Sequence, residues 1–169
     1  MSRSPSDWSD RSEDRDRFGF DHTENELTEL LGRFVPQWVA QRAITVSVSV
    51  PDREFSVGDP VPFTVEIKNR LPVPVTVRTP SRRLWGWEVD GELGASDEPT
   101  YAGETAGEFS LEGSDVLRIE REWSGRFKRT GRDGERTEYV LPDRGVHEIS
   151  AFVATKDPQP RESVEIELR

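Results

Sequence analysis

The sequence predicts a mainly β protein: a seven-stranded antiparallel, immunoglobulin-like β-sandwich preceded by an N-terminal amphipathic helix and a disordered tail. Short runs in which apolar and polar residues alternate recur from residue 43 to the end of the sequence. Gly, Pro, Asn and Asp separate these runs at fairly regular intervals, and no helical pattern lies between them. Because parallel strands need crossover helices, we expect mostly antiparallel pairing. A small closed barrel is the alternative architecture.

Residues 1–21 form the first of three expected segments, a charged tail. Serines are interleaved there with acidic and basic residues, and apolar residues are few. Such a segment buries too little apolar surface to offset the entropy lost on ordering, so we expect it to be disordered.

The second segment, residues 22–42, has the pattern of an amphipathic helix. Thr23 and Glu26 have capping-box spacing, in which each side chain satisfies a free backbone donor of the other. One helical face carries the apolar residues Leu27, Leu30, Leu31, Phe34, Val35, Trp38 and Val39. Pro36 interrupts the pattern, so we expect the helix to stop near Arg33 or to kink and resume at Gln37. The helix either packs on the domain or docks to a partner, and its early glutamates disfavour membrane-surface binding.

The third segment, residues 43–169, is the expected sandwich domain, and its first half contains four strands. Valines and an isoleucine alternate with Thr and Ser over 44–50. Apolar residues at 63, 65 and 67 mark a second strand that ends at Asn69. Alternate valines mark a third over 73–77, where prolines restrict the start to an edge or bulge. Trp85, Trp87 and Val89 mark the fourth, which a turn at Asp90 closes.

Three more strands are expected in the second half, at 116–123, 146–155 and 164–168. In the first of these, Leu117, Ile119 and Trp123 share one face. Arg121 lies on the same face, so its guanidinium must reach solvent or a carboxylate. The polar segments 92–107 and 124–144 are expected to be loops.

The composition is acidic, with 33 Asp and Glu against 23 Lys and Arg and a formal net charge of −10. This acid-rich, lysine-poor composition resembles that of proteins from salt-loving archaea, in which salt screens the surface charge. Codon bias from a GC-rich genome is the alternative explanation. The negative charge argues against nonspecific binding to nucleic acid or to an anionic membrane.

Several protein classes are excluded by what the sequence lacks. There are no cysteines, which excludes disulfides, thiolate metal sites and thiol catalysis. No run of apolar residues is long enough for a transmembrane helix, and the first residues lack the apolar core of a secretion signal. We therefore expect a soluble, cytoplasmic protein.

No catalytic motif is visible. Of the two histidines, His22 borders the tail and His147 lies on an expected strand near the rim of the core. The sequence contains no Gly-x-Ser-x-Gly turn, calcium-loop spacing, helical histidine pair or phosphate-binding glycine loop. We expect no enzyme activity, no metal and no cofactor. A carboxylate-based hydrolase is the alternative. A catalytic pair of carboxylates cannot be recognised in this sequence, because so many acidic residues form numerous pairs by chance.

Charge is segregated along the chain. Residues 86–117 contain nine acidic and no basic residues, whereas residues 121–132 contain five basic residues and Glu122 alone. The two segments either neutralise each other, or the basic one recognises an acidic protein surface. In the second interpretation the binding residues are Arg126, Lys128, Arg129 and Arg132, with Trp123 and Phe127 adding apolar area.

Two tryptophans are further candidates for binding. Trp85 and Trp87 are two apart on an expected strand, so their indoles share one face. We expect at least one of them to pack in the core, as is habitual in immunoglobulin-like sandwiches. The other is a candidate contact anchor at the surface.

The order of several motifs resembles a known family. These motifs are Phe63–Asn69, Leu84–Gly91, Leu111–Ser114, Glu122–Gly125 and Gly145–Ala151. Their order, over residues 44–169, is similar to the immunoglobulin-like domain of the intracellular proteinase inhibitor (BsuPI-like) family from Bacillus. The resemblance implies binding to a serine peptidase. Two departures stand out: His147 occupies the position of the tyrosine in the family's Gly-x-Tyr, and residues 92–107 form a long additional acidic loop.

Taken together, these observations predict a noncatalytic protein-interaction module. We expect its partner to be another protein, with neither nucleic acid nor membrane as a partner, and the oligomeric state stays open. Binding is expected through the basic loop 124–138, the acidic loop 92–107 or both. Inhibition of an intracellular serine peptidase is the alternative implied by the resemblance.

Overall fold

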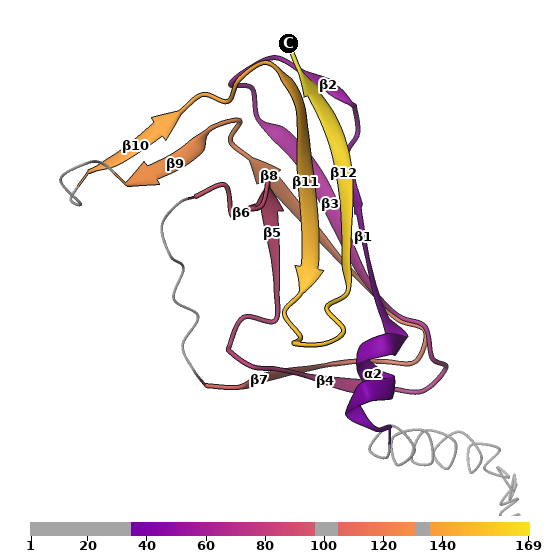
Figure 1. The fold of residues 1–169 in the computed structure, drawn as a ribbon. Coiled ribbons are helices and arrows are strands. Elements are labelled where there is room, and N and C mark those ends of the chain that lie inside the picture. The colour runs from indigo at the N-terminus through magenta and orange to yellow at the C-terminus, as the bar shows by residue number, and fades with distance from the viewer. Residues whose placement is uncertain (1–34, 97–104, 131–135) are drawn as a thin grey trace, which may run out of the picture.

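The computed structural model describes residues 35–96, 105–130 and 136–169. These residues form twelve strands and one short helix, which confirms the prediction of a mainly β protein. Figure 1 shows two larger sheets face to face, a strand pair crossing one end and a hairpin projecting near the other. The predicted tail at 1–21 and the larger part of the helix predicted at 22–42 lie outside the described residues.

Helix α2 (Gln37–Ala43) begins directly after Pro36, where the sequence predicted that a kinked helix would resume. A proline at this point costs no helical hydrogen bond, because the first backbone donors of a helix are unpaired anyway. The Gln37 side chain fixes the helix to the domain: its Nε2 donates to the Thr76 carbonyl at 2.8 Å, and its Oε1 accepts from the Arg78 backbone N–H at 3.1 Å. The described part of the predicted helix therefore packs on the domain. No described helix is long and apolar enough to cross a membrane.

The first large sheet has three antiparallel strands with the longest in the centre. In spatial order they are β1 (Ile44–Ser49), β3 (Val61–Asn69) and β8 (Val116–Trp123). Alternate residues of β3 are buried, as expected for a strand with one face in the core. Among the described residues β8 pairs with β3 alone, so it forms an edge of this sheet.

The second large sheet has five strands. In spatial order they are β2 (Glu54–Phe55), β12 (Arg161–Leu168), β11 (Gly145–Val153), β5 (Trp85–Val89) and β6 (Glu92–Leu93). All pairs are antiparallel except β2 with β12. The expectation of mostly antiparallel sheets is therefore confirmed for the described residues.

Two smaller antiparallel pairs complete the described structure. They are β4 (Val75–Thr79) with β7 (Gly107–Leu111), and β9 (Phe127–Thr130) with β10 (Thr137–Val140). In Figure 1, β4 and β7 run across the end of the molecule next to α2, whereas β9 and β10 form a hairpin that projects near the opposite end.

Each of the seven predicted strands has a counterpart at its predicted place, and the structure adds β2, β6, β7, β9 and β10. β2 and β6 contain two residues each, too few for any alternation to show. β9 and β10 lie in the segment 124–144, which the sequence predicted as a loop. β7 begins at the last residue of the predicted loop 92–107 and continues through residues for which no strand was predicted. Pairing with a partner strand, rather than apolar alternation, establishes these five strands.

The apolar core fills the space between the two large sheets. Every other side chain of β3 contributes to it, opposite inward-facing residues of β5, β11 and β12. The Phe63 ring of β3 lies 5.2 Å from the Trp87 ring of β5, which shows the direct contact between the sheets. The largest fully buried side chains of the core are those of Trp123, Phe63, Ile67, Ile149, Ile166 and Leu168.

Asn69 fastens the crossed pair β4–β7 to the end of β3. Its side chain is fully buried, with Nδ2 donating to the carbonyls of Val73 at 2.8 Å and Glu112 at 2.9 Å. Its Oδ1 accepts from the Leu71 backbone N–H at 3.0 Å. Because these partners lie at the ends of β4 and β7, the one amide sets where the crossed pair lies against the first sheet.

Candidate functional site

The two aromatic residues of the predicted basic loop are buried. Trp123 is 1% exposed and Phe127 7% exposed, and their ring centroids lie 5.4 Å apart. The Trp123 indole donates to the Arg126 carbonyl at 2.9 Å, which locks the start of the β9–β10 hairpin to the end of β8. Both rings therefore support the hairpin and offer little surface in the single chain.

The basic residues of this loop have different surroundings. Arg129 makes a bidentate ion pair with Glu92, in which the distance from Nη2 to Oε1 is 2.8 Å. The Arg129 guanidinium also lies over the Phe127 ring. The Lys128 backbone N–H donates to Ala95, and Arg126 is exposed. Arg132 lies outside the described residues. Of the two interpretations of the segregated charge, the Glu92–Arg129 pair supports mutual neutralisation.

Other acids of the 86–117 segment also have cationic partners from elsewhere in the chain. Glu88 binds Arg161 at 2.8 Å, and Glu108 lies 3.8 Å from Arg78. These exposed or partly exposed pairs each contribute little stability, but they reduce the local excess of negative charge. The centre of the predicted acidic loop, residues 97–104, lies outside the described residues.

His147 lies in a polar cage at the same end of the sandwich as the β9–β10 hairpin. Its Nδ1 is 2.6 Å from Asp90 Oδ2, and its Nε2 is 2.8 Å from the Asp143 carbonyl. Burial lowers the pKa of His147, but the hydrogen bonds to Asp90 and Asp143 outweigh it, so the net pKa is raised above its ordinary value. Two acceptors on the two ring nitrogens favour the doubly protonated imidazolium, which has no lone pair for base catalysis or metal binding.

The two tryptophans of β5 lie in different surroundings. Trp87 is partly buried and packs against the core, with its ring beside that of Phe63. Trp85 lies toward the edge of the sandwich, partly exposed, with the Arg121 guanidinium 5.4 Å from its ring centroid. A cation over an indole at this distance is an attractive contact, so Arg121 covers one face of Trp85.

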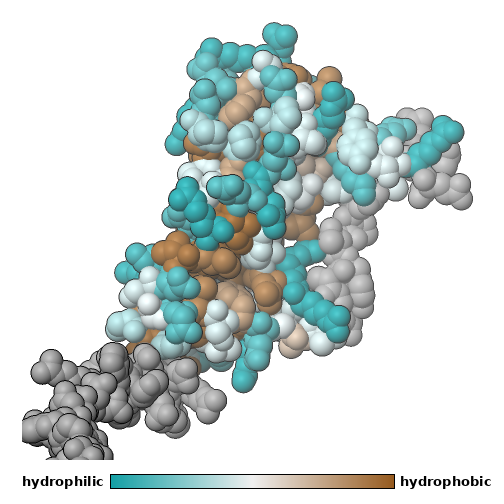
Figure 2. Space-filling model, turned by 180° about the vertical axis from the view of Figure 1, so that it is seen from behind, coloured by the Kyte–Doolittle hydropathy of each residue, from teal (hydrophilic) through white to brown (hydrophobic). Residues whose placement is uncertain are grey.

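Beside Trp85 the two sheets fail to close over each other. Leu117 of β8 is 42% exposed although it is in register with the fully buried Ile67 of β3. The uncovered space is an apolar pocket of about 130 Å³, lined by Ile67, Leu84, Trp85, Phe109 and Leu117, which we call the flank pocket. Figure 2 shows apolar atoms exposed midway along the back of the molecule.

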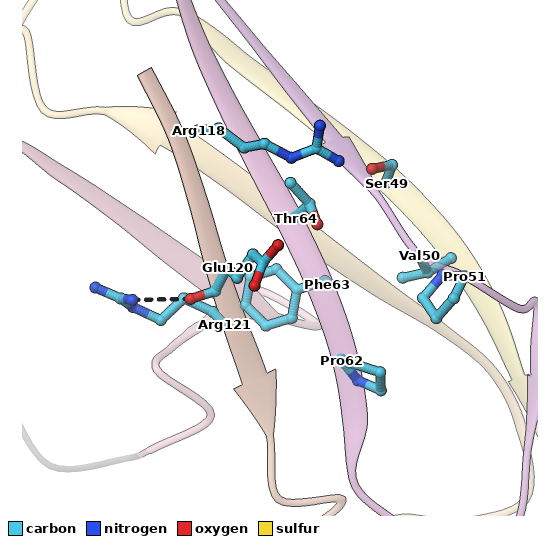
Figure 3. Close-up of a pocket in the computed structure, with 9 residues that line it drawn as sticks. All are labelled: Ser49, Val50, Pro51, Pro62, Phe63, Thr64, Arg118, Glu120 and Arg121. Atoms are coloured by element: carbon cyan, nitrogen blue, oxygen red, sulfur yellow. Dashed lines mark hydrogen bonds between the residues drawn. The ribbon is translucent and has the colours of Figure 1, made fainter. Parts of the chain in front are cut away.

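A wider hollow of about 370 Å³ lies over the outer side of the first sheet. Figure 3 shows its lining residues, with Arg118, Glu120 and Arg121 carried by β8 and the others by β1, β3 and the turn after β1. Arg121 extends to the side of β8 opposite β3, and its Nη1 donates to the Glu120 carbonyl at 2.8 Å. The edge of β8 thus lies between a polar hollow and the apolar flank pocket.

Sequence reasoning identified Trp85 as a candidate contact residue but missed the rest of the flank pocket. Leu117 and Ile119 were expected on the same inward face as Trp123, and nothing in their spacing distinguishes a covered from an uncovered position. The one signal in the sequence was Arg121 on that face, because a charge at an inward position marks an edge strand. Among the described residues, no group of three or more His, Asp or Glu is arranged to hold a metal ion.

Comparisons with known proteins identify a family but carry no functional argument. The model of a family described as "Family of unknown function (DUF7974)" matches residues 32–169. No curated protein matches. Neither this match nor the structure tests the resemblance to the intracellular proteinase inhibitor family, so serine-peptidase inhibition stays a prediction.

Solved structures with some similarity include three proteins of different kinds. A β-glucosidase from Listeria innocua shares 15% identity over 74% of this chain, with a TM-score of 0.46. The alkylpurine DNA glycosylase AlkC from Pseudomonas fluorescens shares 16% over 86%, with a TM-score of 0.44. The sporulation control protein Spo0M from Bacillus subtilis shares 12% over 75%, with a TM-score of 0.44. The matched regions cover 16%, 36% and 49% of those chains, respectively.

Proposed function

We propose that this chain, which belongs to the family of unknown function DUF7974, is a noncatalytic protein-interaction module that binds an extended polypeptide segment along the edge of β8. In this proposal the two large sheets form an immunoglobulin-like sandwich that acts as a rigid frame. The bound segment adds a strand beside β8, and its inward-facing side chains cover the flank pocket. Backbone hydrogen bonds then provide affinity, and the pocket provides selectivity.

The observation that carries the proposal is the coincidence of an open strand edge with uncovered apolar surface. Among the described residues β8 has a partner strand on one side only. Next to its other side, Leu117, Trp85 and Phe109 line the flank pocket without being covered by the opposite sheet. A sandwich that served only as a scaffold would gain stability by closing this gap, because exposed apolar area contributes nothing to the core.

Two features support the noncatalytic part of the proposal: the hydrogen bonds of the one described histidine and the lining of the flank pocket. His147 is the one described histidine, and both of its ring nitrogens are already hydrogen-bonded. A general base needs a free lone pair directed at the proton that it removes. The lining of the flank pocket is apolar, with no carboxylate.

The basic loop is the weaker binding candidate. Trp123 and Phe127 are buried, and Arg129 already holds Glu92. Recruiting Arg129 to an external acid would therefore break an existing ion pair. The flank pocket requires no such exchange of partners for its apolar residues.

The experiment is a search for extended peptide ligands in a displayed library of random peptides, followed by NMR mapping at low protein concentration. We expect selected peptides to carry alternating apolar residues and to shift the amides of residues 116–123 first. Leu117→Asp should weaken their binding at least about tenfold, since it places a charge against an apolar side chain.

Val146→Asp is the matched control. Val146 is 68% exposed on β11, outside the flank pocket, so the same change there should leave peptide binding unaltered. Absence of any ligand, or ligands whose binding Leu117→Asp leaves unchanged, would refute the proposed function.

A further inference from the structure

The hydrogen-bond phase of β8 determines which of its residues face the open edge. The Asn69 backbone N–H donates to the Asp115 carbonyl at 3.0 Å, directly before the first residue of β8. Hydrogen-bonded and non-hydrogen-bonded pairs alternate along an antiparallel ladder. The backbone groups of Leu117, Ile119 and Arg121 therefore face β3. Those of Arg118 and Glu120 point the other way, toward the open edge.

The side chains of these edge residues alternate in charge. Arg118 and Glu120 lie on the outer face of the sheet, opposite Glu66 and Thr64 of β3. The distance from Arg118 Nη1 to Glu66 Oε1 is 3.6 Å, and both side chains are largely exposed, so this pair leaves the guanidinium accessible. Edge strands with charges usually resist pairing with other strands, unless the charges of the incoming strand are complementary.

The strand that complements β8 is β8 itself. An antiparallel copy centred on Ile119 places Arg118 opposite Glu120 of the second copy, and Glu120 opposite Arg118 of the second copy. Both positions have backbone groups on the open edge, so each pair also exchanges backbone hydrogen bonds. Centring on Arg118 places Arg118 opposite Arg118, and centring on Glu120 places Glu120 opposite Glu120 on the axis, with an Arg118–Glu122 pair on each side. Of the three registers, the one centred on Ile119 has no like charges opposite one another.

The inner face of the same arrangement covers apolar surface. Ile119 meets Ile119 of the second copy on the twofold axis, and Leu117 meets the Arg121 side chain. The aliphatic stem of an arginine can cover an exposed leucine while its charged group stays in water. Leu117, 42% exposed in the single chain, thereby loses solvent contact.

Arg121 changes one partner in this arrangement. In the single chain its Nη1 donates to the Glu120 carbonyl, which occupies an acceptor on the open edge. In the paired state that carbonyl accepts from the Arg118 backbone N–H of the second copy. The guanidinium moves off this carbonyl and keeps its contact with the Trp85 ring.

We propose that the segment bound at the edge of β8 is β8 of a second copy of this chain, giving a twofold-symmetric dimer with a continuous sheet across both copies. This inference rests on the proposed function, which assigns the β8 edge to protein binding. It adds the identity of the partner and a single register.

The test is the oligomeric state of the full chain, measured by sedimentation equilibrium over a range of concentrations. We expect the wild type to dimerise. Arg118→Glu and Glu120→Arg should each raise the dissociation constant at least about tenfold, because each places like charges opposite one another at two symmetric positions. The double variant with both changes restores opposite charges and should dimerise again.

Mixing the two single variants gives the sharpest result. One copy then carries Glu at 118 and 120 and the other carries Arg at both, so only the mixed dimer has opposite charges in the centred register. We expect a mixture that associates although neither component does. Arg78→Glu, which reverses an exposed arginine on β4, is the matched control and should dimerise like the wild type.

Two results would overturn the inference: a wild-type chain that stays monomeric, or a dimer that the charge reversals leave intact. Failure of this inference is distinguishable from failure of the proposed function. A monomeric chain whose β8 amides still respond to a selected peptide, in a manner abolished by Leu117→Asp, loses the second copy as partner but keeps the binding edge.

Discussion

Replacing Asn69 with alanine should destabilise the protein strongly, because this one buried side chain joins β3 to the crossed pair β4–β7. Asn69→Ala removes hydrogen bonds to the carbonyls of Val73 and Glu112 and from the Leu71 N–H, all within 3.0 Å. A hydrogen bond contributes about 1 kcal/mol net, and a buried group left without a partner costs about 1–3 kcal/mol. Because Asn69 is fully buried, water cannot replace its side chain as a hydrogen-bond partner, and we expect the free energy of unfolding to fall by about 3–4 kcal/mol.

The assay is unfolding in urea, monitored by tryptophan fluorescence. It gives the free energy of unfolding of each variant, and equal slopes of this free energy against urea concentration show that the variants can be compared. Thr76→Val is the matched control, because it removes an exposed hydrogen bond in the same crossed strand pair. This bond joins the hydroxyls of Thr76 and Ser110, which lie 2.8 Å apart. We expect this control to lose about 0.5 kcal/mol or less. A loss below about 1 kcal/mol for Asn69→Ala, or one equal to that of Thr76→Val, would refute the assigned role of the buried amide.

Three further predictions address other parts of the fold. Because the pKa of His147 is raised on folding, its contact with Asp90 should stabilise the protein fully below about pH 6.5 and lose this effect as pH rises through the raised pKa. The melting temperatures of the wild type and of His147→Gln, plotted against pH, should therefore converge at high pH. Two parallel plots would contradict this prediction. Gly113→Ala places a Cβ against the Pro72 carbonyl, closer than van der Waals contact allows, so we expect a clear fall in melting temperature, whereas Gly91→Ala meets no atom within 4 Å and is strained by its positive φ alone. Arg129→Ser should lower the stability of the hairpin by about 1 kcal/mol or less, and a double-mutant cycle with Glu92→Ser that gives no coupling would contradict the ion pair.

The strands that alternate were predictable, and the edges were not. β3 follows from Phe63, Val65 and Ile67 because one face of a half-buried strand repeats every second residue. The same periodicity places Leu117 on an inward face, yet it does not show whether another sheet covers that face. Coverage depends on how β5 and the crossed pair β4–β7 lie against β8, which is a tertiary property.

The sequence left two interpretations of the charged loops open, for a related reason. The run from Arg126 to Arg132 suggests a free basic surface when it is taken on its own. In the structure Glu92, 37 residues away, neutralises Arg129. The sequence shows that the charges exist, but the pairing depends on β6 lying beside the start of the hairpin. The neighbouring Trp123 is buried for a similar reason, since its indole N–H finds the Arg126 carbonyl.

Amide hydrogen exchange along β8 tests most directly whether this edge binds a polypeptide strand. In the dilute single chain, the amides of Arg118 and Glu120 should exchange quickly while those of Ile119 and Arg121, which face β3, exchange slowly. At high protein concentration, or with a selected peptide bound, the amides of Arg118 and Glu120 should become protected. Protection of both amides already at high dilution, or rapid exchange of both under every condition, would contradict β8 as the binding edge.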